Sequence, residues 1–268
     1  GIPMVDIWRE TFPVRFGSVD RSDRLTLGAV FSIFQEAAIS HAEDLGVGRD
    51  NLMKSGQGWI LSRISVFVER RPRYGDTVTA ESWPRGSEKL FALRDYCIRD
   101  ERGAVMVRGR GCWLIVDIEK RRPLRPQQYI EKLPLNEGLN ALQSGGATLN
   151  SRNNLSRFSE RQAGYSDIDY YGHVNNARYI QWIQDMCDPE LLDKAEKFRL
   201  DINYLSEILP GERVELLSAP IDGNPPEGAD TAGYPASGRG FAYEGRGLFE
   251  GGASASGRIV FRAELRTG

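Results

Sequence analysis

The sequence predicts an α+β protein made of two similar halves, each a long helix followed by antiparallel strands. Two observations lead to this class. Apolar residues recur at helical spacing over roughly 27–45, and the pattern changes to strand-like alternation from Trp59 onward. A segment around Asp20 also has a second copy around Asp169, and in both places further strand patterns follow. Two matched segments in the same order indicate an internal duplication.

The composition is that of a globular protein with a real core. The chain has 268 residues, 40% hydrophobic and 27% charged, which allows one large domain or two of ordinary size. A net charge of −2 argues against a nucleic-acid binder. The sequence contains no run of eighteen apolar residues that would form a transmembrane helix. Its first residues lack a basic and then apolar signal pattern, so we expect a cytoplasmic protein.

The cysteines and histidines do not form a metal-binding pattern. Cys97, Cys112 and Cys187 are scattered and odd in number, which favours buried thiols in a reducing compartment. His41 and His173 are the two histidines of the chain, too few for a multi-histidine metal site. We expect neither a metal nor a cofactor.

The first half is predicted to begin with a short strand over Thr11–Gly17 and a helix over roughly 27–45. Thr26 is a plausible N-cap of this helix, and Gly46 is a natural stop. A long strand follows from Trp59. Turn residues then separate further strands, which are predicted over 78–83, 90–99 and 104–118.

A polar segment separates the halves. Residues 123–157 are rich in proline and small polar residues, which predicts a linker that is ordered where it packs on a domain. We therefore divide the chain into an N-terminal domain (1–125), a linker (126–157) and a C-terminal domain (158–268). Residues 221–257 are rich in Gly, Ala, Ser and Pro, which weakens any strand prediction there. A final strand is predicted over Gly257–Arg266.

The duplication aligns residue by residue. Placing Asp20 on Asp169 matches GSVDRSDRLTLGAVFSIFQEA with SDIDYYGHVNNARYIQWIQDM without gaps, and sets Arg24 against His173. Further on, ISVFVERRPRYGDTV is matched with INYLSEILPGERV by placing Glu69 on Glu207 and, after a gap of two residues, Gly75 on Gly211; Ile64 then falls on Ile202 and Pro72 on Pro210. Two such sheets can pair along an edge into one continuous sheet, which also hides edge strands.

The stretch Tyr165–Asp185 carries the densest polar chemistry, placed directly before an amphipathic helix pattern. Free amides at a helix N-terminus stabilise negative charge, so active sites are often built at such a point. Asn175 is most simply the N-cap of this helix. Asp169 has a simple structural interpretation as the cap of the preceding turn.

SDIDYYGHVNNARYIQWIQD resembles the signature of the acyl-acyl carrier protein (acyl-ACP) thioesterases, which reads Asp-x-Asn-x-His-Val-Asn-Asn before a helix. DRLTLGAVFSIFQEAAISHAEDLG and WILSRISVFVERRPRYGDTV resemble that family's first helix and the strand and turn after it. The resemblance covers Thr11 to the end and is weakest in the linker and over 221–257. It implies two tandem hot-dog domains and hydrolysis of acyl-ACP to free fatty acid, which ends fatty-acid synthesis. The implied partner is the acyl carrier protein, and the enzyme would be a monomer or homodimer.

The resemblance also implies a site on the second domain, with Asp169, His173 and Glu207 as catalytic residues. We expect Glu207 to act as general base on water, His173 to orient that water or share its proton, and Asp169 to fix the histidine tautomer or bind the water. The amides of residues 175–177 would polarise the thioester carbonyl. Tyr171 stands where the family usually has Asn, and either supplies a hydrogen bond or points away.

Several structural alternatives stay open. Glu207 is placed in an apolar strand, where a charged residue is either at the solvent edge or functional. Ile208 follows it where plant members often have Cys, which excludes a cysteine nucleophile at that position. His41 is expected to be a core or rim histidine. Because Arg24 replaces the histidine in the first half, with Glu69 as a structural counterpart, we expect one active site and a first half that holds the acyl chain. Candidates to line that tunnel are Phe31, Phe34 and Trp59, although core packing is the simpler role for each.

Two basic clusters, over residues 119–125 and 69–73, are candidates to receive the acidic carrier protein, although charged turns are usually just solvated. Two other functions compete with the one implied: an acyl-CoA thioesterase of the same fold, and a non-catalytic acyl-binding or regulatory hot-dog protein. A hot-dog dehydratase has a different arrangement of His and Asp, which this sequence does not resemble.

Overall fold

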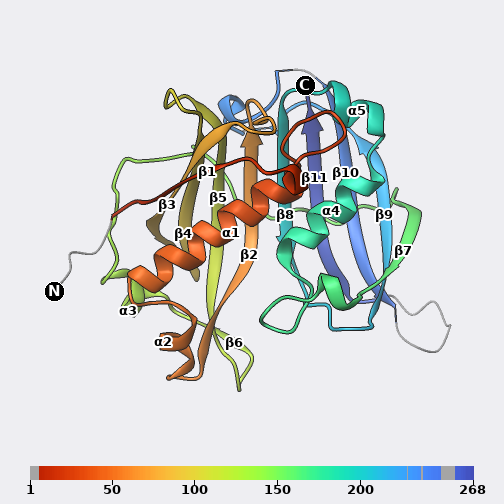
Figure 1. Ribbon diagram of the computed structural model, residues 1–268. Coiled ribbons are helices and arrows are strands. Elements are labelled where there is room, and N and C mark those ends of the chain that lie inside the picture. Colours follow the sequence, from red (N-terminus) through yellow and green to blue (C-terminus); the bar gives the residue numbers. More distant parts are fainter. Residues whose placement is uncertain (1–5, 228, 237, 249–256) are drawn as a thin grey trace.

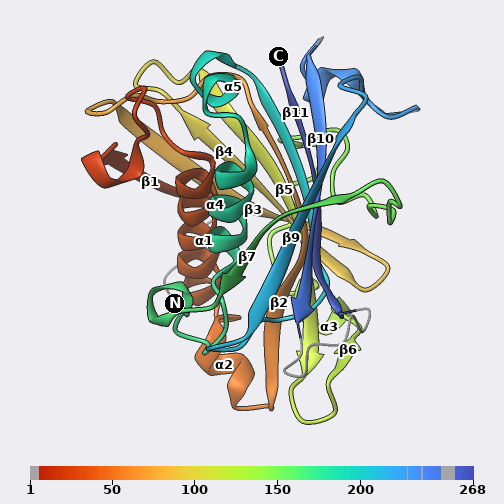
Figure 2. The same ribbon diagram turned by 90° about the vertical axis from the view of Figure 1, so that its right-hand side faces the viewer.

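A single antiparallel sheet runs through the molecule, with its long helices on one face (Figures 1 and 2). The computed structural model describes residues 6–227, 229–236, 238–248 and 257–268. Within these residues the sheet has eleven strands in the order β1-β3-β4-β5-β2-β8-β11-β10-β9-β7, with β6 paired to β5. The two halves of this order mirror each other, as expected from the duplication, and the α+β class is confirmed.

The first half contains the expected helix and strands. Thr26 caps α1 by accepting from the Ala29 amide at 3.0 Å, and Gly46 follows the helix with φ +73°. The first strand is shifted from its prediction, because pairing with β3 begins at Trp8 and ends at Pro13. The elements are β1 (Trp8–Pro13), α1 (Leu27–Asp44), α2 (Arg49–Met53), β2 (Gln57–Val68), β3 (Thr77–Glu88), β4 (Phe91–Arg99), β5 (Val105–Asp117), β6 (Arg122–Leu124) and α3 (Gln127–Ile130).

The second half repeats this plan. Its elements are β7 (Ser156–Gln162), α4 (Asn176–Met186), α5 (Pro189–Lys194), β8 (Phe198–Tyr204), β9 (Arg213–Ile221), β10 (Arg239–Leu248) and β11 (Ile259–Thr267). β10 lies within the Gly-rich stretch for which the strand prediction was weak. It is a central strand, paired on both sides, and a Cβ at Gly245 would collide with the Phe261 ring, so close packing requires glycine there. Residues 249–256 of that stretch lie outside the described residues.

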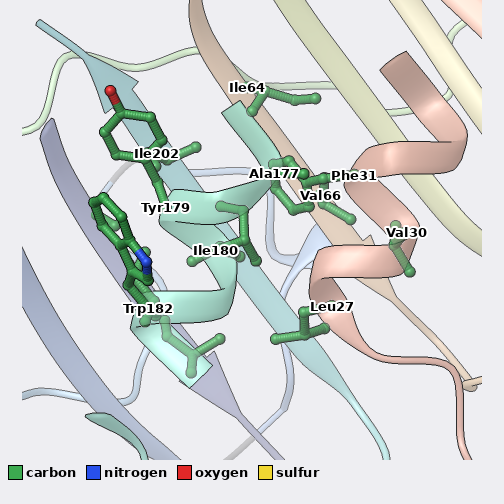
Figure 3. Close-up of a cluster of buried hydrophobic side chains, with 14 of the residues drawn as sticks. Leu27, Val30, Phe31, Ile64, Val66, Ala177, Tyr179, Ile180, Trp182 and Ile202 are labelled. Carbon is green, nitrogen blue, oxygen red and sulfur yellow. The ribbon is translucent and has the colours of Figure 1, made fainter. Parts of the chain in front are cut away.

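The two halves join along a seam between β2 and β8. These strands pair antiparallel from Arg63–Asn203 to Val68–Phe198, which confirms that the two sheets pair along an edge. α1 and α4 lie side by side over the seam, and one hydrophobic core continues beneath both (Figure 3). That core includes Val30, Phe31, Ile64, Val66, Ala177, Ile180 and Ile202.

The segment between α3 and β7 runs over the opposite face of the sheet (Figure 2). Its Gly146 amide donates to Ser65 Oγ at 2.9 Å, and its Leu149 amide donates to Asn203 Oδ1 at 2.8 Å. Ser65 and Asn203 belong to the two seam strands, so this segment packs across the junction of the halves. The exact boundaries of the linker and the two domains stay a prediction.

The three cysteines are free and buried, as expected. Burial raises the pKa of each of the Cys97, Cys112 and Cys187 thiols to about 11, so they are held as inert thiols. Among the helices of the described ranges, none has the length and apolar character needed to cross a membrane.

Candidate active site

The loop before α4 is built like the loop before α1. In both, an aspartate amide donates to the carbonyl four residues on: Asp20 to Arg24 at 2.8 Å and Asp169 to His173 at 2.9 Å. In both, the aspartate Oδ1 also accepts from the amide of the second residue after it: from Ser22 at 2.8 Å and from Tyr171 at 2.9 Å. This correspondence confirms the alignment of Asp20 with Asp169 and of Arg24 with His173.

Asp169 therefore shapes the turn that presents His173. Its Oδ1 accepts from the Tyr171 amide at 2.9 Å, which is the Asx-turn role that the residue type favours. The structural interpretation of this residue is thus correct for one carboxylate oxygen. No hydrogen bond joins the Asp169 carboxylate to the His173 ring in the described structure.

The start of α4 leaves one backbone amide available. Asn175 is the N-cap, as expected: its Oδ1 accepts from the Ala177 amide at 2.9 Å. The Asn175 amide itself donates to the Asp167 carbonyl at 2.9 Å. Of the three amides expected to polarise a carbonyl, two are therefore already engaged. Asn176 is the one whose amide finds no acceptor among the described residues, at the positive end of the helix dipole.

His173 and Glu207 form a pair that is open to solvent. Their Nε2 and Oε2 atoms are 3.0 Å apart, and the two side chains are 40% and 52% exposed. Such a pair can hold a water molecule and accept its proton while a substrate approaches. The structure thus brings together two of the residues predicted from distant parts of the sequence.

Glu207 does not lie on a strand, contrary to its prediction. β8 ends at Tyr204, because the Leu205 and Ser206 amides both donate to the Val260 carbonyl, at 2.9 and 3.2 Å. This shared acceptor interrupts the ladder and turns the chain toward α4. The turn is held there by the Val174 amide, which donates to the Ile208 carbonyl at 2.9 Å.

The same turn in the first half shows that Glu207 corresponds to Arg71. There the Glu69 and Arg70 amides both donate to the Met106 carbonyl, at 2.9 and 3.2 Å. Glu69 is therefore the counterpart of Leu205, and the sequence alignment that set it against Glu207 was wrong by two residues. The same shift applies to Pro72.

Further along, the alignment is correct. The Gly75 amide donates to the Val14 carbonyl at 3.0 Å, and the Gly211 amide donates to the Ala163 carbonyl at 2.8 Å. The same shift also extends back along the strands. Val68 pairs with Val107 as Tyr204 pairs with Phe261, so Val68 corresponds to Tyr204 and Ile64 to Leu200. The segment therefore aligns without a gap, and the match of Ile64 with Ile202 was also wrong by two residues.

In the first half, the position equivalent to the open pair is closed. The Arg71 side chain is 3% exposed, and its Nη1 donates to Asp20 Oδ2 at 2.6 Å. Its Nη2 donates to the Leu192 carbonyl at the end of α5, also at 2.6 Å. Burial lowers the Arg71 pKa, with Asp20 acting in the opposite direction. Arg71 in place of Glu207 and Arg24 in place of His173 leave this copy without a carboxylate–imidazole pair.

Arg258 supports the loop of Glu207, and sequence reasoning missed it. Its Nη2 donates to the Glu207 carbonyl at 2.8 Å and to Glu212 Oε2 at 2.5 Å. The same Glu212 oxygen accepts from the Leu209 amide at 2.9 Å. Arg258 and Glu212 therefore hold the turn of residues 207–212 in place at both of its ends. An arginine at the start of the last predicted strand was the one available signal, and it carried no indication of this partner.

A buried tyrosine lies beneath the two carboxylates. Tyr179 of α4 is 2% exposed and packs against Tyr204, with ring centroids 5.3 Å apart. Burial raises the Tyr179 pKa, Arg258 opposes this, and the nearby charges of Glu207 and Asp169 raise it further. Tyr179 therefore keeps its proton and packs beneath the loop of Glu207.

Tyr171 faces α2. Its ring contacts Tyr170 with centroids 5.8 Å apart, and the Arg49 guanidinium lies 5.4 Å from its ring centroid. Arg49 also lies 4.4 Å over the Tyr170 ring and donates to the Tyr170 hydroxyl at 3.2 Å. Of the two expectations for Tyr171, a hydrogen bond to the site and a side chain that points away, the contacts match the second.

The candidate acyl-chain residues lie mainly in the core of the first half. Phe31 is buried, and Phe34 stacks on Tyr96 with ring centroids 4.8 Å apart. Trp59 is half-buried and donates from Nε1 to the Val47 carbonyl at 2.8 Å. Their part in acyl binding stays a prediction. His41 is fully buried, with Nδ1 3.0 Å from Arg94 Nη1, which confirms the expected core position.

Comparisons with known proteins show what this chain is similar to. The family description "Acyl-ACP thioesterase N-terminal domain" matches residues 6–132, and "Acyl-ACP thioesterase C-terminal domain" matches residues 150–235. A chloroplastic acyl-[acyl-carrier-protein] hydrolase of Cuphea viscosissima is 25% identical over 239 residues, covering 80% of this chain and 55% of the relative. A chloroplastic palmitoyl-acyl carrier protein thioesterase of Cuphea hookeriana is 26% identical, covering 80% and 54%. The chain thus spans about half the length of the curated relatives it matches.

Solved structures extend the likeness to the whole fold. An acyl-ACP thioesterase from Bacteroides thetaiotaomicron superposes with a TM-score of 0.81 at 22% identity, covering 98% of both chains. The 12:0-ACP thioesterase from Umbellularia californica superposes with a TM-score of 0.78 at 21% identity, covering 98% of this chain and 97% of the other. The expected fold of two tandem hot-dog domains is confirmed. Matched at both of its halves, the chain belongs to the acyl-ACP thioesterase family.

Proposed function

We propose that the protein is a thioesterase that releases free fatty acid from acyl-ACP and so ends fatty-acid synthesis. The observation that carries this proposal is the solvent-open pair of His173 and Glu207, 3.0 Å apart, at the N-terminus of α4. A family of acyl-ACP thioesterases supplies the substrate class. A binding protein without catalysis has no need for an acid–base pair that is exposed beside a free helix amide.

The reaction follows from this geometry. A water molecule beside Glu207 attacks the thioester carbonyl carbon while the Glu207 carboxylate takes its proton. The Asn176 amide and the dipole of α4 stabilise the negative charge that develops on the carbonyl oxygen. The carbon–sulfur bond then breaks, the carrier thiolate leaves with the electron pair, and Glu207 returns the proton to sulfur.

The remaining residues act through these groups. His173 orients the water and shares its proton with Glu207, and Asp169 holds the turn that carries His173. Phe31, Phe34 and Trp59 are proposed to line the acyl tunnel in the first half. No step requires a cofactor.

The partner proposed is the acyl carrier protein bearing a fatty acyl thioester, met in the cytoplasm by a monomer or homodimer of this chain. The curated relatives are described as chloroplastic, which is said of those proteins. Pairing of β2 with β8 joins two hot-dog domains within one chain, so a dimer is not needed to complete the sheet.

One assay tests the proposal: free acid released from acyl-ACP and from the matching acyl-CoA at equal concentrations. We expect hydrolysis of both and a higher kcat/KM for acyl-ACP. A preference for acyl-CoA would replace the carrier as substrate, and release of acid from neither thioester would leave an acyl-binding protein instead. A panel of acyl-ACPs of graded length then gives the chain-length preference.

A further inference from the structure

The turn between β5 and β6 carries a group of cations with few carboxylates near them. This basic hairpin, residues 117–125, contains four exposed cations, Lys120, Arg121, Arg122 and Arg125. Its carboxylates are Asp117 and Glu119, and Lys120 lies 3.9 Å from Asp117. The three arginines have no carboxylate within ion-pair distance in the described part of the chain. Their charge is therefore available to a partner, in a chain whose net charge is −2.

The arginines of the second basic cluster, residues 69–73, are paired with carboxylates. Arg70 pairs with Asp100 at 2.8 Å, Arg71 with Asp20 at 2.6 Å, and Arg73 lies 3.7 Å from Asp23. Internal carboxylates thus neutralise this cluster. Of the two candidates from the sequence, only the basic hairpin presents unpaired charge.

The strand register places the basic hairpin and the catalytic pair at the same end of the sheet. β5 ends at Asp117, opposite Gln57 at the start of β2. β8 runs antiparallel to β2, so that Glu207, just after β8, lies toward the start of β2. β5 and β8 flank β2 at two strand spacings, about 10 Å. The ladder with β8 ends at Arg63, six residues along β2 from Gln57, so the end of β8 also lies about 20 Å along the strand from the end of β5. The 69–73 turn follows the other end of β2. Figure 1 shows β6 and α2 at the lower end of the molecule and α5 at the upper end.

α2 connects the basic hairpin to the catalytic loop. The Ile118 amide donates to the Gly56 carbonyl at 3.0 Å, in the short segment between α2 and β2. At the other side of α2, Arg49 contacts the exposed Tyr170 ring beside the catalytic turn. The hairpin, α2 and the loop before α4 therefore form one surface around the open His173–Glu207 pair.

The backbone of the basic hairpin is also unusual at its tip. Arg121 has φ +50°, in the left-handed region where glycine is the default residue. An arginine there carries a modest conformational cost and places an exposed cation within the turn. Such a cost is consistent with a use for the charge, since no internal ion pair offsets it.

We propose that the basic hairpin is the docking surface for the acidic carrier protein. The proposal rests on the proposed function and names the place where its partner binds. Opposite charge at this place steers the carrier toward the end of the sheet where the thioester is cleaved. The paired cluster at the far end takes no part in docking.

The test compares two double charge reversals of equal size. Arg121→Glu with Arg122→Glu alters the basic hairpin, and Arg70→Glu with Arg73→Glu alters the paired cluster. Each protein is assayed on acyl-ACP and on the small thioester acyl-N-acetylcysteamine, which has no carrier to dock. For the hairpin variant we expect kcat/KM on acyl-ACP to fall by about 10- to 100-fold at low salt, since steering acts on association by factors of this order. Its activity on the small thioester should stay within about twofold of the wild type, because the variant does not touch the catalytic pair.

A second measurement does not depend on any variant. For the wild type, kcat/KM on acyl-ACP should fall as salt is raised, while kcat/KM on the small thioester stays nearly constant. The hairpin variant should lose most of this salt dependence, and the variant of the paired cluster should keep it. Unchanged acyl-ACP activity in the hairpin variant, or an equal loss in the cluster variant, would overturn the docking site. A wild type that cleaves the small thioester but not acyl-ACP would instead remove the carrier from the proposed function.

Discussion

The loops before α1 and α4 have the same backbone and opposite chemistry. The first holds Asp20, Arg24 and, across from them, Arg71; the second holds Asp169, His173 and Glu207 in the equivalent places. In the first loop a buried arginine is neutralised by aspartate and covered by the end of α5. In the second, the histidine and glutamate pair with each other and face solvent. Two side-chain differences on one scaffold thus separate a structural ion pair from a candidate active site.

The two loops also differ in the short helix that covers them and in how completely it does so. α5 follows α4 and closes the first loop, where Asp193 accepts from Arg21 and from Ser22. α2 follows α1 and reaches the second loop through Arg49, which contacts the exposed Tyr170 and leaves the His173–Glu207 pair open. The helix of each half therefore serves the loop of the other, and access to the site depends on both halves.

The largest expected effect tests which residue is the base. Glu207→Gln should lower kcat/KM on acyl-ACP by about 10²- to 10⁴-fold, because the proton acceptor for water is removed. Glu69→Gln is the matched control, since the sequence alignment placed Glu69 on Glu207 and the structure does not. It should stay within about twofold of the wild type, because Glu69 follows the end of β2 that lies away from the His173–Glu207 pair. Rates of free-acid release decide between them, and an active Glu207→Gln protein would reject the assigned base.

The next effect tests the buried Arg71–Asp20 pair of the first half. Arg71→Met should destabilise the protein by about 3 kcal/mol, because it leaves Asp20 without its buried partner. Glu207→Met, at the equivalent position of the open copy, should cost less than about 0.5 kcal/mol, since that side chain is largely exposed. Urea unfolding of the two variants measures the difference. Equal stability losses would mean that the two positions are not structurally distinct.

Substitutions of Arg258 test how the loop of Glu207 is held in place. Arg258→Gln should lower kcat about tenfold, as expected for the loss of about 1.5 kcal/mol from charged hydrogen bonds that position the Glu207 loop. Arg258→Lys should recover part of this loss, because it keeps the charge but not the forked geometry. If the midpoint of unfolding falls while kcat is unchanged, Arg258 is a stabilising residue alone.

The helix caps should respond alike in the two copies. Thr26→Ala and Asn175→Ala each remove an N-cap acceptor, and each should cost about 1 kcal/mol of stability. Chemical unfolding of both variants checks this, with the acid-release assay run in parallel. A loss of activity is expected for Asn175→Ala alone, because only α4 begins at the site.

The smallest expected effect concerns Asp193 of α5, which contacts the loop before α1. Two hydrogen bonds lower the Asp193 pKa to about 2, below its value of about 3.9 in an unfolded chain; the bond from Arg21 has the larger effect and the bond from Ser22 the smaller. The stabilisation from this carboxylate is therefore present above about pH 4 and is lost as the pH falls through about 2. The stability difference between the wild type and Asp193→Asn should shrink over that range, and a constant difference would contradict the role of the ion pair.

Local patterns in the sequence predicted much of this fold. The two long helices, their caps and the first repeated segment depend on residues within a few positions of one another, and these predictions are confirmed. The second repeated segment was misaligned because Glu69 and Glu207 coincide in type. Its true register is set by the carbonyls of Met106 and Val260, which are distant in sequence. The contribution of Arg258 was invisible for the same reason, since it depends on where β11 begins beside the loop after β8.

The seam between β2 and β8 bears on how the chain reaches this structure during synthesis. Arg63 pairs with Asn203, 140 positions later, so the first half is complete while its partner strand has not yet been made. Until then β2 is an open edge, the kind of surface that recruits other chains. The seam carries one safeguard: Ser65 donates to the buried Asp201 at 2.5 Å, and two copies of β2 paired together would bring no carboxylate to this serine. The nascent first half is thereby matched to its own second half better than to another copy of itself.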